Sequence, residues 1–433
     1  MRILVTGANG LIGRYVVYRL RADGHNVSGS CRRPGKVRGL PADIDLIQAD
    51  FNTDVDPQVW HDRLGGFDAV VNCVGALQDG AGDNLENVHI RGASALFSGA
   101  QSAGVLRIVH ISAIGADAKG NTGFARTKAK TEELLSETEV EWVVLRPGLV
   151  LAPTVYGGSA ALRGLAGLPW ITPLPASSEP VQIIGIDDLT RIVSLAISTP
   201  ELVGGVHDVA NPAPTTLPEI VAQLRGWLGF KPGHALRVPN WLMWPVTKGA
   251  DLAGVFGWRS PMRSTAWAQL GQGVVARCDH LPDRDLIGEI RPLEAVLASA
   301  PSTLQDRWHA RFYFLKPLIV LLLGIFGIVT GLIALWPGRG MAESELMAVG
   351  TSAGAAAMLN LAASTLDIFN GLLILWKRTH KLGLMLLLAV CGVYLVAGSI
   401  LDPSLWADPL GPLIKVFPVV ALCLVAAAMW EER

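Results

Sequence analysis

The sequence predicts an α/β fold, a doubly wound parallel sheet, followed by a C-terminal bundle of four transmembrane helices. A glycine-rich turn at residues 7–13 follows an apolar run at the N-terminus. Short apolar runs then alternate with helical patterns up to about residue 197, which is typical of folds built from βαβ units. Beyond residue 312, four hydrophobic stretches each exceed the ~18 apolar residues that mark a membrane-spanning helix.

The apolar runs expected to form strands are short, and most of them do not alternate with polar residues. Parallel strands that are buried on both faces have this pattern, whereas a strand with one wet face alternates. The seven expected strands are residues 3–5, 26–31, 44–48, 69–74, 107–112, 142–146 and 181–184.

The amino-acid composition limits which kinds of partner the chain can be expected to bind. Its 433 residues include 36 Lys and Arg against 37 Asp and Glu, a formal net charge of −1, so we expect no nucleic-acid partner. The five cysteines are scattered without metal-like pairing, so no metal site is expected, and they suit a reducing cytosol.

The glycine-rich turn has the features of a phosphate-binding loop. Glycines let the chain turn tightly, approach a pyrophosphate and pack the following helix, expected at 14–22, against its strand. The alternative is a tight strand-to-helix turn without a ligand. The residues expected to contact a dinucleotide here are Thr6, Gly7, Asn9, Gly10, Leu11, Ile12 and Gly13.

The spacing Gly-x-x-Gly-x-x-Gly resembles the extended and atypical branches of the short-chain dehydrogenase/reductase superfamily, whose nucleotide domain has the Rossmann fold. Further motifs stand in that family's order over roughly residues 1–230. They are Asp50-Phe51, Asn72-Cys73-Val74-Gly75, His110-Ile111-Ser112, Arg146-Pro147-Gly148 and Ile186-Asp187-Asp188-Leu189. The chain is similar to atypical members such as the nucleotide-binding accessory subunit of respiratory complex I. The resemblance implies that the cofactor also contacts Asp50, Phe51, Cys73, Val74, Gly75, Ser112, Lys128, Pro147 and Gly148.

The residues after the second strand favour NADP(H) over NAD(H). An NAD site places a carboxylate about 20 residues past the glycines, where it accepts from the ribose 2′-hydroxyl. Here that position holds Arg32 and Arg33, and a guanidinium offers a fork to a 2′-phosphate. The alternative is that both arginines form a solvated strand end. The resemblance implies that Asp50 meets the adenine amino group, although a carboxylate there also suits a turn.

The catalytic pattern of the family is incomplete. The resemblance implies a Ser, a Tyr and a Lys, with the Tyr four residues before the Lys. Ser112 and Lys128 fit, but the Tyr position is Phe124, which cannot transfer a proton. Tyr156 is the nearest substitute donor by sequence, and the alternative is that it only lines a cleft between domains. Ser112 also suits a hydrogen bond at the end of its strand.

We expect three domains along the chain. Residues 1–230 form the NAD(P)-binding Rossmann domain with interleaved substrate-side segments. Residues 231–312 form variable linker helices that end in an interfacial anchor, because Trp308 and Tyr313 stand beside Arg307 and Arg311. Residues 313–433 form the membrane domain.

The membrane domain resembles the DoxX-like family, some of whose members are linked to quinone-dependent oxidation. The motif that carries this resemblance is Leu366-Asp367-Ile368-Phe369-Asn370-Gly371-Leu372. Asp367 is expected to face the bundle interior, either as a headgroup, proton or quinone contact or as an interhelical hydrogen-bond clasp. The expected spans are residues 315–336, 349–376, 382–401 and 410–430.

Loop charges predict the orientation. The basic loop at residues 377–381 is expected in the cytoplasm, which places the soluble domain and the C-terminus there as well, on a bacterial-type inner membrane. One interpretation is then a membrane-anchored NADP(H)-dependent oxidoreductase acting on a hydrophobic substrate such as a quinone or lipid. The other is a non-catalytic nucleotide-binding or redox-sensing subunit of a membrane complex, which Phe124 favours.

Overall fold

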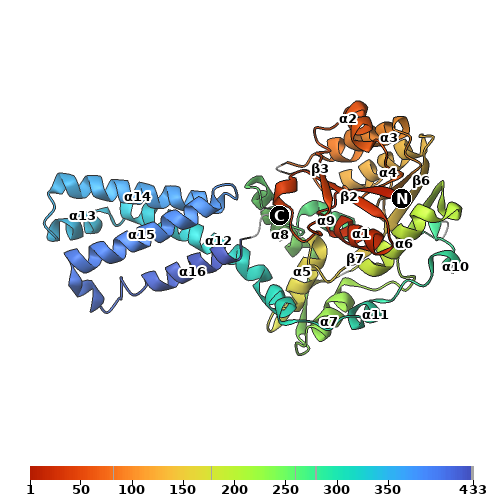
Figure 1. Cartoon of the computed structure of the whole chain (residues 1–433). Coiled ribbons are helices and arrows are strands. Elements are labelled where there is room, and N and C mark those ends of the chain that lie inside the picture. The colour runs from red at the N-terminus through yellow and green to blue at the C-terminus, as the bar shows by residue number, and fades with distance from the viewer. Residues whose placement is uncertain (81, 177, 259, 278–279, 431–433) are drawn as a thin grey trace. The chain divides into compact units, whose positions relative to one another are not determined.

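The computed structural model describes residues 1–80, 82–176, 178–258, 260–277 and 280–430 (Figure 1). The chain divides into two compact units. The first comprises Met1–Gly254 and Ser260–Ala310, and the second comprises Val255–Arg259 and Arg311–Arg433.

The first unit is built on a seven-stranded parallel sheet in the order β10-β6-β5-β4-β1-β2-β3. Strands β2 and β3 are added on one side of β1, and β4, β5, β6 and β10 on its other side. Ligands of doubly wound folds bind at such a switch point. The strands are β1 (Arg2–Thr6), β2 (Asn26–Cys31), β3 (Asp45–Gln48), β4 (Ala69–Asn72), β5 (Arg107–Ile111), β6 (Glu141–Pro147) and β10 (Gly205–Val209). The predicted doubly wound parallel fold is confirmed.

The seventh expected strand is wrong. Residues 183–185 form β9 (Ile183–Gly185), which pairs with β7 (Leu149–Leu151) in a separate two-stranded sheet. The edge of the main sheet is β10 instead, paired with β6. That strand carries His207 and Asp208, so it lacks the continuous apolar run used to find the others.

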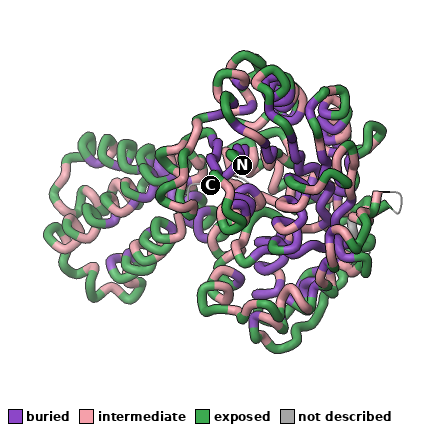
Figure 2. The backbone as a smooth tube through the Cα atoms, turned by 45° about the vertical axis from the view of Figure 1, so that its right-hand side comes forward, coloured by how far each residue is buried: buried purple, intermediate pink, exposed green. Residues whose placement is uncertain are grey.

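Helices cover both faces of the sheet. Successive side chains of each strand point to opposite faces, so each strand contacts the helices on both sides. Ile3 and Val5 of β1 pack with α1 (Leu11–Ala22) and α6 (Ile186–Ser198) on one face. Leu4 faces the opposite way, toward the cluster of α2 (Pro57–Leu64), α3 (Gly92–Ser102) and α4 (Gly123–Ser136). Figure 2 shows the resulting concentration of buried residues in this part of the chain.

A third apolar cluster forms a smaller layer beside the sheet. It unites α5 (Gly157–Ala166) and α7 (Leu217–Trp227) with the later segment that contains Leu293 and Ala310. A parallel ribbon of β8 (Ile171–Pro175) and β11 (His234–Val238) belongs to the same unit. The remaining helices of this unit are α8 (Asn240–Val255), α9 (Ser264–Leu270), α10 (Arg284–Ile287) and α11 (Leu293–Ala298).

The second unit contains three helices long and apolar enough to cross a membrane: α12 (Leu304–Leu335), α14 (Ala353–Leu375) and α15 (His380–Leu401). The short helix α13 (Arg339–Ala348) lies between the first two. Many leucines on these helices are exposed, for example Leu322 and Leu332, as expected of surfaces that face lipid.

The fourth expected span, residues 410–430, is shorter than predicted. The helix there, α16 (Val416–Ala428), has 13 residues, or about 20 Å, against a hydrocarbon core of about 30 Å. The chain before it turns at Gly411, whose φ is +59°, so residues 410–415 do not extend the helix. The four-helix bundle therefore holds three helices of spanning length among the described residues.

Glycines allow α12 and α14 to pack backbone against backbone. A Cβ atom on Gly331 would lie 2.5 Å from the Ser364 carbonyl oxygen, and one on Gly371 would lie 2.5 Å from the Gly324 carbonyl oxygen. Small residues at a helix interface permit this close approach in membranes.

Residues 255–258, which we call the strap, pack on the second unit although the flanking chain belongs to the first. The Phe256 carbonyl accepts a hydrogen bond from the Lys377 backbone N–H at 3.1 Å. The Trp258 indole Nε1–H donates to the Leu375 carbonyl at 2.7 Å. The Trp258 ring also meets the rings of His380 and Trp430 edge to face.

Candidate nucleotide-binding site

The glycine-rich turn lies between β1 and α1 and is held by close backbone approaches. Gly7 has φ +65°, and a Cβ on it would lie 3.1 Å from the Cys73 carbonyl oxygen. A Cβ on Gly13 would lie 2.3 Å from the Gly7 carbonyl oxygen, so no larger residue fits without moving the helix. The helix begins at Leu11, three residues before the expected start, and its N-terminal N–H groups are left for an anion.

A buried polar row fixes the ends of the central strands beneath this turn. Thr6 donates its hydroxyl hydrogen to Asn72 Oδ1 at 2.7 Å, and Asn72 Nδ2 lies 3.2 Å from His110 Nδ1. Because an amide nitrogen only donates, the His110 Nδ1 accepts. The side chain of Thr6, predicted to contact the cofactor, therefore serves to join β1 to β4.

Lys128 lies beneath the loop that follows β4. Its ammonium donates to the Ile111 carbonyl at 2.8 Å and is 4% exposed. A Cβ added to Gly75 would stand 3.4 Å from Lys128 Nζ, so Gly75 lies directly against the ammonium. Burial lowers the pKa of Lys128 to about 8, although the negative charge of Glu132 opposes that shift.

His89 is a site residue that the sequence analysis missed. Its Nε2 accepts from the Ala76 backbone N–H at 3.0 Å, and its Nδ1 bonds Thr127 Oγ1 at 2.8 Å. Burial, together with the positive charge of Lys128, lowers its pKa to about 2, so the ring is neutral and both nitrogens are used. It lies on a π-helical turn, Glu86–Arg91, which the pattern of apolar residues does not reveal.

Ser112 belongs to a buried charged network. It donates to Glu132, whose carboxylate also binds the Arg146 guanidinium, with Nε at 2.9 Å. Arg146 in turn lies 3.9 Å from Asp208, where burial raises the pKa of the carboxyl group. The hydroxyl hydrogen of Ser112 is thus directed into the core, and its catalytic role stays a prediction.

The aromatic positions expected to bear on catalysis lie apart. Phe124 is on the first turn of α4, and its ring meets the His89 ring edge to face at 6.0 Å. Tyr156 precedes α5 and is 43% exposed. In the described part of the chain, its hydroxyl makes no hydrogen bond to Ser112 or Lys128.

The residues expected around the adenosine end have local partners. Arg32 pairs with Asp83 at 2.7 Å, and Arg33 is exposed. Asp50 Oδ1 accepts from the Asn52 backbone N–H at 3.0 Å, which is the turn role given as the alternative.

Five more predicted cofactor residues are mainly packed against the fold. The Phe51 ring packs on Trp60 with centroids 5.0 Å apart. Burial raises the pKa of the Cys73 thiol to about 12, so it is not a reactive thiolate. The Pro147 carbonyl accepts from the Ile114 N–H, and a Cβ on Gly148 would lie 2.4 Å from the Gln182 carbonyl oxygen. Val74 donates its backbone N–H to Asn72 Oδ1.

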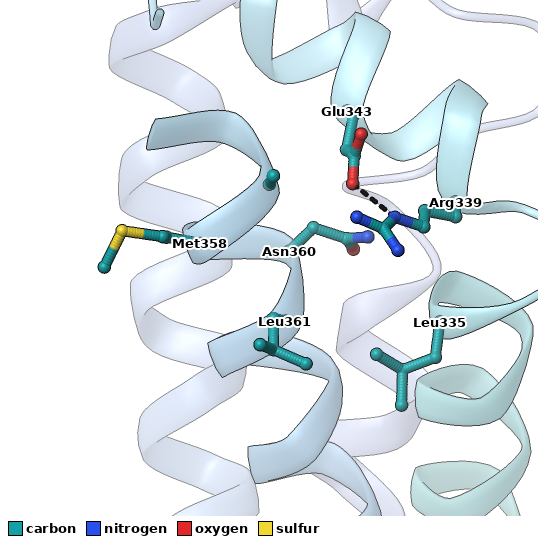
Figure 3. Close-up of a pocket in the computed structure, with 7 residues that line it drawn as sticks. Leu335, Arg339, Glu343, Met358, Asn360 and Leu361 are labelled. Carbon is teal, nitrogen blue, oxygen red and sulfur yellow. Dashed lines mark hydrogen bonds and ion pairs between the residues drawn. The ribbon is translucent and has the colours of Figure 1, made fainter. Parts of the chain in front are cut away.

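The second unit has a mainly apolar pocket of about 180 Å³ where α12, α13 and α14 meet (Figure 3). Arg339 and Glu343 form an ion pair at 2.7 Å on its rim. Asn360, which is buried, donates to the Ala334 carbonyl at 3.0 Å and accepts from Ser364 at 3.3 Å. The bond to Ala334 joins α14 to α12 and fits an interhelical clasp, whereas the bond from Ser364 lies within α14, and Asp367, three residues after Ser364, is half-buried.

Comparisons with known proteins agree with this architecture. Residues 7–159 match an NAD(P)H-binding family, and residues 324–424 match the DoxX-like family. An uncharacterized protein of Mycobacterium tuberculosis is 29% identical over 225 residues, covering 52% of this chain and 23% of that protein. The chain therefore spans about a quarter of the length of this relative.

The alignments with two further relatives cover a larger share of each relative's length. The mitochondrial 40 kDa subunit of NADH-ubiquinone oxidoreductase from Neurospora crassa is 25% identical over 56% of this chain and 64% of that protein. A ceramide reductase of Caulobacter vibrioides is 25% identical over 55% of this chain and 74% of that protein.

Among solved structures, an NADPH-dependent quinone oxidoreductase of Escherichia coli superposes with a TM-score of 0.52 at 20% identity, covering 69% of this chain and 99% of that one. That likeness supports the fold alone. The chain thus joins an NAD(P)-binding, short-chain dehydrogenase-like Rossmann domain to a DoxX-like membrane domain.

Proposed function

We propose that this protein is a membrane-anchored NADP(H)-binding protein, and that binding rather than turnover is its main property. The observation that carries the proposal is that the loop after β4 lies between the two predicted contact points: the Cys73 carbonyl stands 3.1 Å from the Cβ position of Gly7, and the Cβ position of Gly75 stands 3.4 Å from the buried Lys128 ammonium. With a dinucleotide bound, the turn would hold the pyrophosphate and Lys128 would donate to the nicotinamide ribose. When bound, the nicotinamide supplies a hydride donor or acceptor.

Two features favour binding over catalysis. Phe124 holds the position of the usual proton donor, and the hydroxyl hydrogen of Ser112 is committed to Glu132. A positioned proton donor typically contributes about 10²–10⁴-fold in rate, so an ordinary carbonyl substrate is expected to react slowly. A nucleotide-binding subunit of a membrane complex is consistent with both features.

The second candidate is an oxidoreductase acting on a hydrophobic substrate, such as a quinone or a lipid, drawn from the bilayer. The attached membrane domain favours it, and one of the relatives is named a ceramide reductase. An oxidoreductase needs a proton donor in place of the tyrosine that is absent at position 124. Tyr156 is the nearest tyrosine along the chain.

Cofactor choice and orientation complete the proposal. Arg32 and Arg33 stand where an NAD site carries a carboxylate, which favours the 2′-phosphate of NADP(H). The basic loop around Lys377 is proposed to face the cytoplasm of a bacterial-type inner membrane, together with the nucleotide domain.

Calorimetry on the full chain in lipid nanodiscs tests the proposal. NADPH is expected to bind, and Lys128→Ala is expected to weaken it about tenfold, since a charged hydrogen bond contributes about 1.5–3 kcal/mol. Lys130→Ala is the matched control, because Lys130 lies on the same helix and pairs with Glu133 at the surface. Failure of both NADPH and NADH to bind the unmodified chain would overturn the proposal.

A further inference from the structure

Helix α8 leaves most of its large apolar residues exposed, the reverse of a helix on the surface of a soluble protein. Polar residues are among those that face the protein: Asp251 accepts from Arg263 Nε at 3.1 Å and from the Ser264 backbone N–H at 3.3 Å. Thr247, on the same side, is 4% exposed. An ordinary surface helix buries its apolar residues and exposes its polar ones.

The outward face of α8 is apolar. Trp241 is 72% exposed, Trp244 is 65% exposed and Val255 is 77% exposed. Leu252, which is 61% exposed, lies on the same side of the helix, and Lys248 stands among these residues with its Nζ 3.8 Å from Asp251 Oδ2. An apolar surface of this kind marks a site of interaction, because isolated soluble domains rarely leave large apolar patches in water.

The chain that follows α8 indicates what covers this face. Val255, the last residue of α8, is the first residue of the strap, and Trp258 of the strap is hydrogen-bonded to the end of α14. Trp258 and Trp430 cluster there beside the basic loop that contains Lys381, which lies over the Trp430 ring. Tryptophan and basic residues at the end of spanning helices mark the membrane–water interface.

We propose that the outward face of α8 lies in the boundary between lipid headgroups and acyl chains of the bilayer that the second unit spans. The helix has 16 residues, about 24 Å, and its last residue, Val255, is the first residue of the strap. Tryptophan rings suit this depth.

The neighbouring ribbon extends the same kind of surface. Trp170, just before β8, is 79% exposed, and its carbonyl accepts from the His234 N–H that opens β11. Leu236 on β11 is 54% exposed, and β11 ends at Val238, two residues before α8 begins. The proposal does not depend on nucleotide binding, because none of these residues belongs to the nucleotide site.

Fluorescence quenching tests the location of α8 in the full chain reconstituted in nanodiscs. Trp244 is replaced by a fluorescent amino acid, and the matched control carries the same replacement at Leu106, a 62%-exposed residue between α3 and β5. Lipids brominated on the acyl chain near the headgroup are expected to quench most of the emission at position 244 and none at position 106. Aqueous iodide is expected to do the reverse.

Two results would overturn the proposal. If iodide quenches position 244 as strongly as position 106, the face is in water. If neither quencher reaches position 244, a protein surface covers it. Should the replacement at 244 disturb folding, the same measurement at Leu252, which is 61% exposed on this face, decides the question.

Discussion

Ser112 donates its hydroxyl hydrogen to Glu132, which lies on α4 one turn beyond Lys128. The same carboxylate neutralises Arg146, a residue of β6 that is 8% exposed. A position expected to serve catalysis is thus part of the ionic core that joins β5, β6 and α4. The stability of the sheet is expected to depend on this network.

Glu132→Gln is therefore expected to destabilise the first unit by about 3 kcal/mol, because it removes the carboxylate that binds the buried Arg146 guanidinium and leaves it facing the more distant Asp208, at 3.9 Å. Glu133→Gln is the control: Glu133 is 57% exposed, so the change is expected to cost less than about 0.5 kcal/mol. Urea unfolding in detergent, followed by circular dichroism, measures both. Equal stabilities of the two variants would contradict the network's role.

The buried Lys128 predicts a pH-dependent stability. Its pKa falls from 10.5 to about 8 on folding, so between these values the unfolded chain binds more protons and stability rises with pH. Below pH 8 both states are protonated, and the full cost of burying the ammonium is present. Lys128→Met is expected to raise Tm at pH 7 and to lose that advantage near pH 10.

The control for this experiment is Lys130→Met, since Lys130 is exposed on the same helix and pairs with Glu133. Its Tm difference from the unmodified chain is expected to stay constant across the same pH range. A constant difference for Lys128→Met would show that its ammonium is not destabilised by burial.

The arginines after β2 predict cofactor preference. Replacing both Arg32 and Arg33 by Ala is expected to weaken NADPH binding at least about tenfold and to leave NADH binding unchanged. Asp83→Asn releases Arg32 from its ion pair and is expected to keep or strengthen NADPH binding. Calorimetry that finds equal affinities of the unmodified chain for NADPH and NADH would show that the arginines do not select the 2′-phosphate.

Phe124 separates the two candidate functions. Phe124→Tyr is expected to leave nucleotide affinity nearly unchanged, because the glycine turn and Lys128 make the proposed contacts. Restoring the hydroxyl raises carbonyl reduction by up to about 10²–10⁴-fold if the pocket is otherwise competent. Robust turnover by the unmodified chain, abolished by Tyr156→Phe, would instead establish the oxidoreductase reading.

Orientation is tested by reporter fusions, which also decide whether α16 crosses the membrane. With the loop at Lys377 in the cytoplasm, a reporter active only in the cytoplasm should be active after Arg433 if α16 crosses. A reporter in the loop at Asp408 should then be active only outside. Activity on the outer side at both positions would mean that α16, with 13 residues, does not cross.

Local patterns in the sequence predicted the structural elements whose formation depends mainly on residues that are neighbours along the chain. The turn from Gly7 to Gly13 and the first six strands follow from glycine geometry and from apolar runs, and the structure has them. Strand β10 was missed because Asp208 and His207 interrupt its apolar character. The span at the C-terminus was overestimated because hydropathy alone does not detect the turn at Gly411.

Side-chain partners far apart in the sequence were not predictable from local patterns. His89 reaches Ala76 and Thr127 only after the π-helical turn places it there. Arg32 and Asp83 are 51 residues apart, and no local pattern in either segment predicts that they form an ion pair. The direction of the Ser112 hydroxyl likewise depends on Glu132 and Arg146, which come from two other elements.

The strap means that the two units are joined at three points along the chain rather than one. The backbone crosses between them at 254–255, again at 259–260, and finally at 310–311. A protease cut anywhere between 260 and 303 would therefore leave the nucleotide domain attached through the hydrogen bonds and aromatic contacts of Phe256 and Trp258. Such a nicked protein is expected to sediment with the membrane fraction and to come free only when the bundle is dissolved.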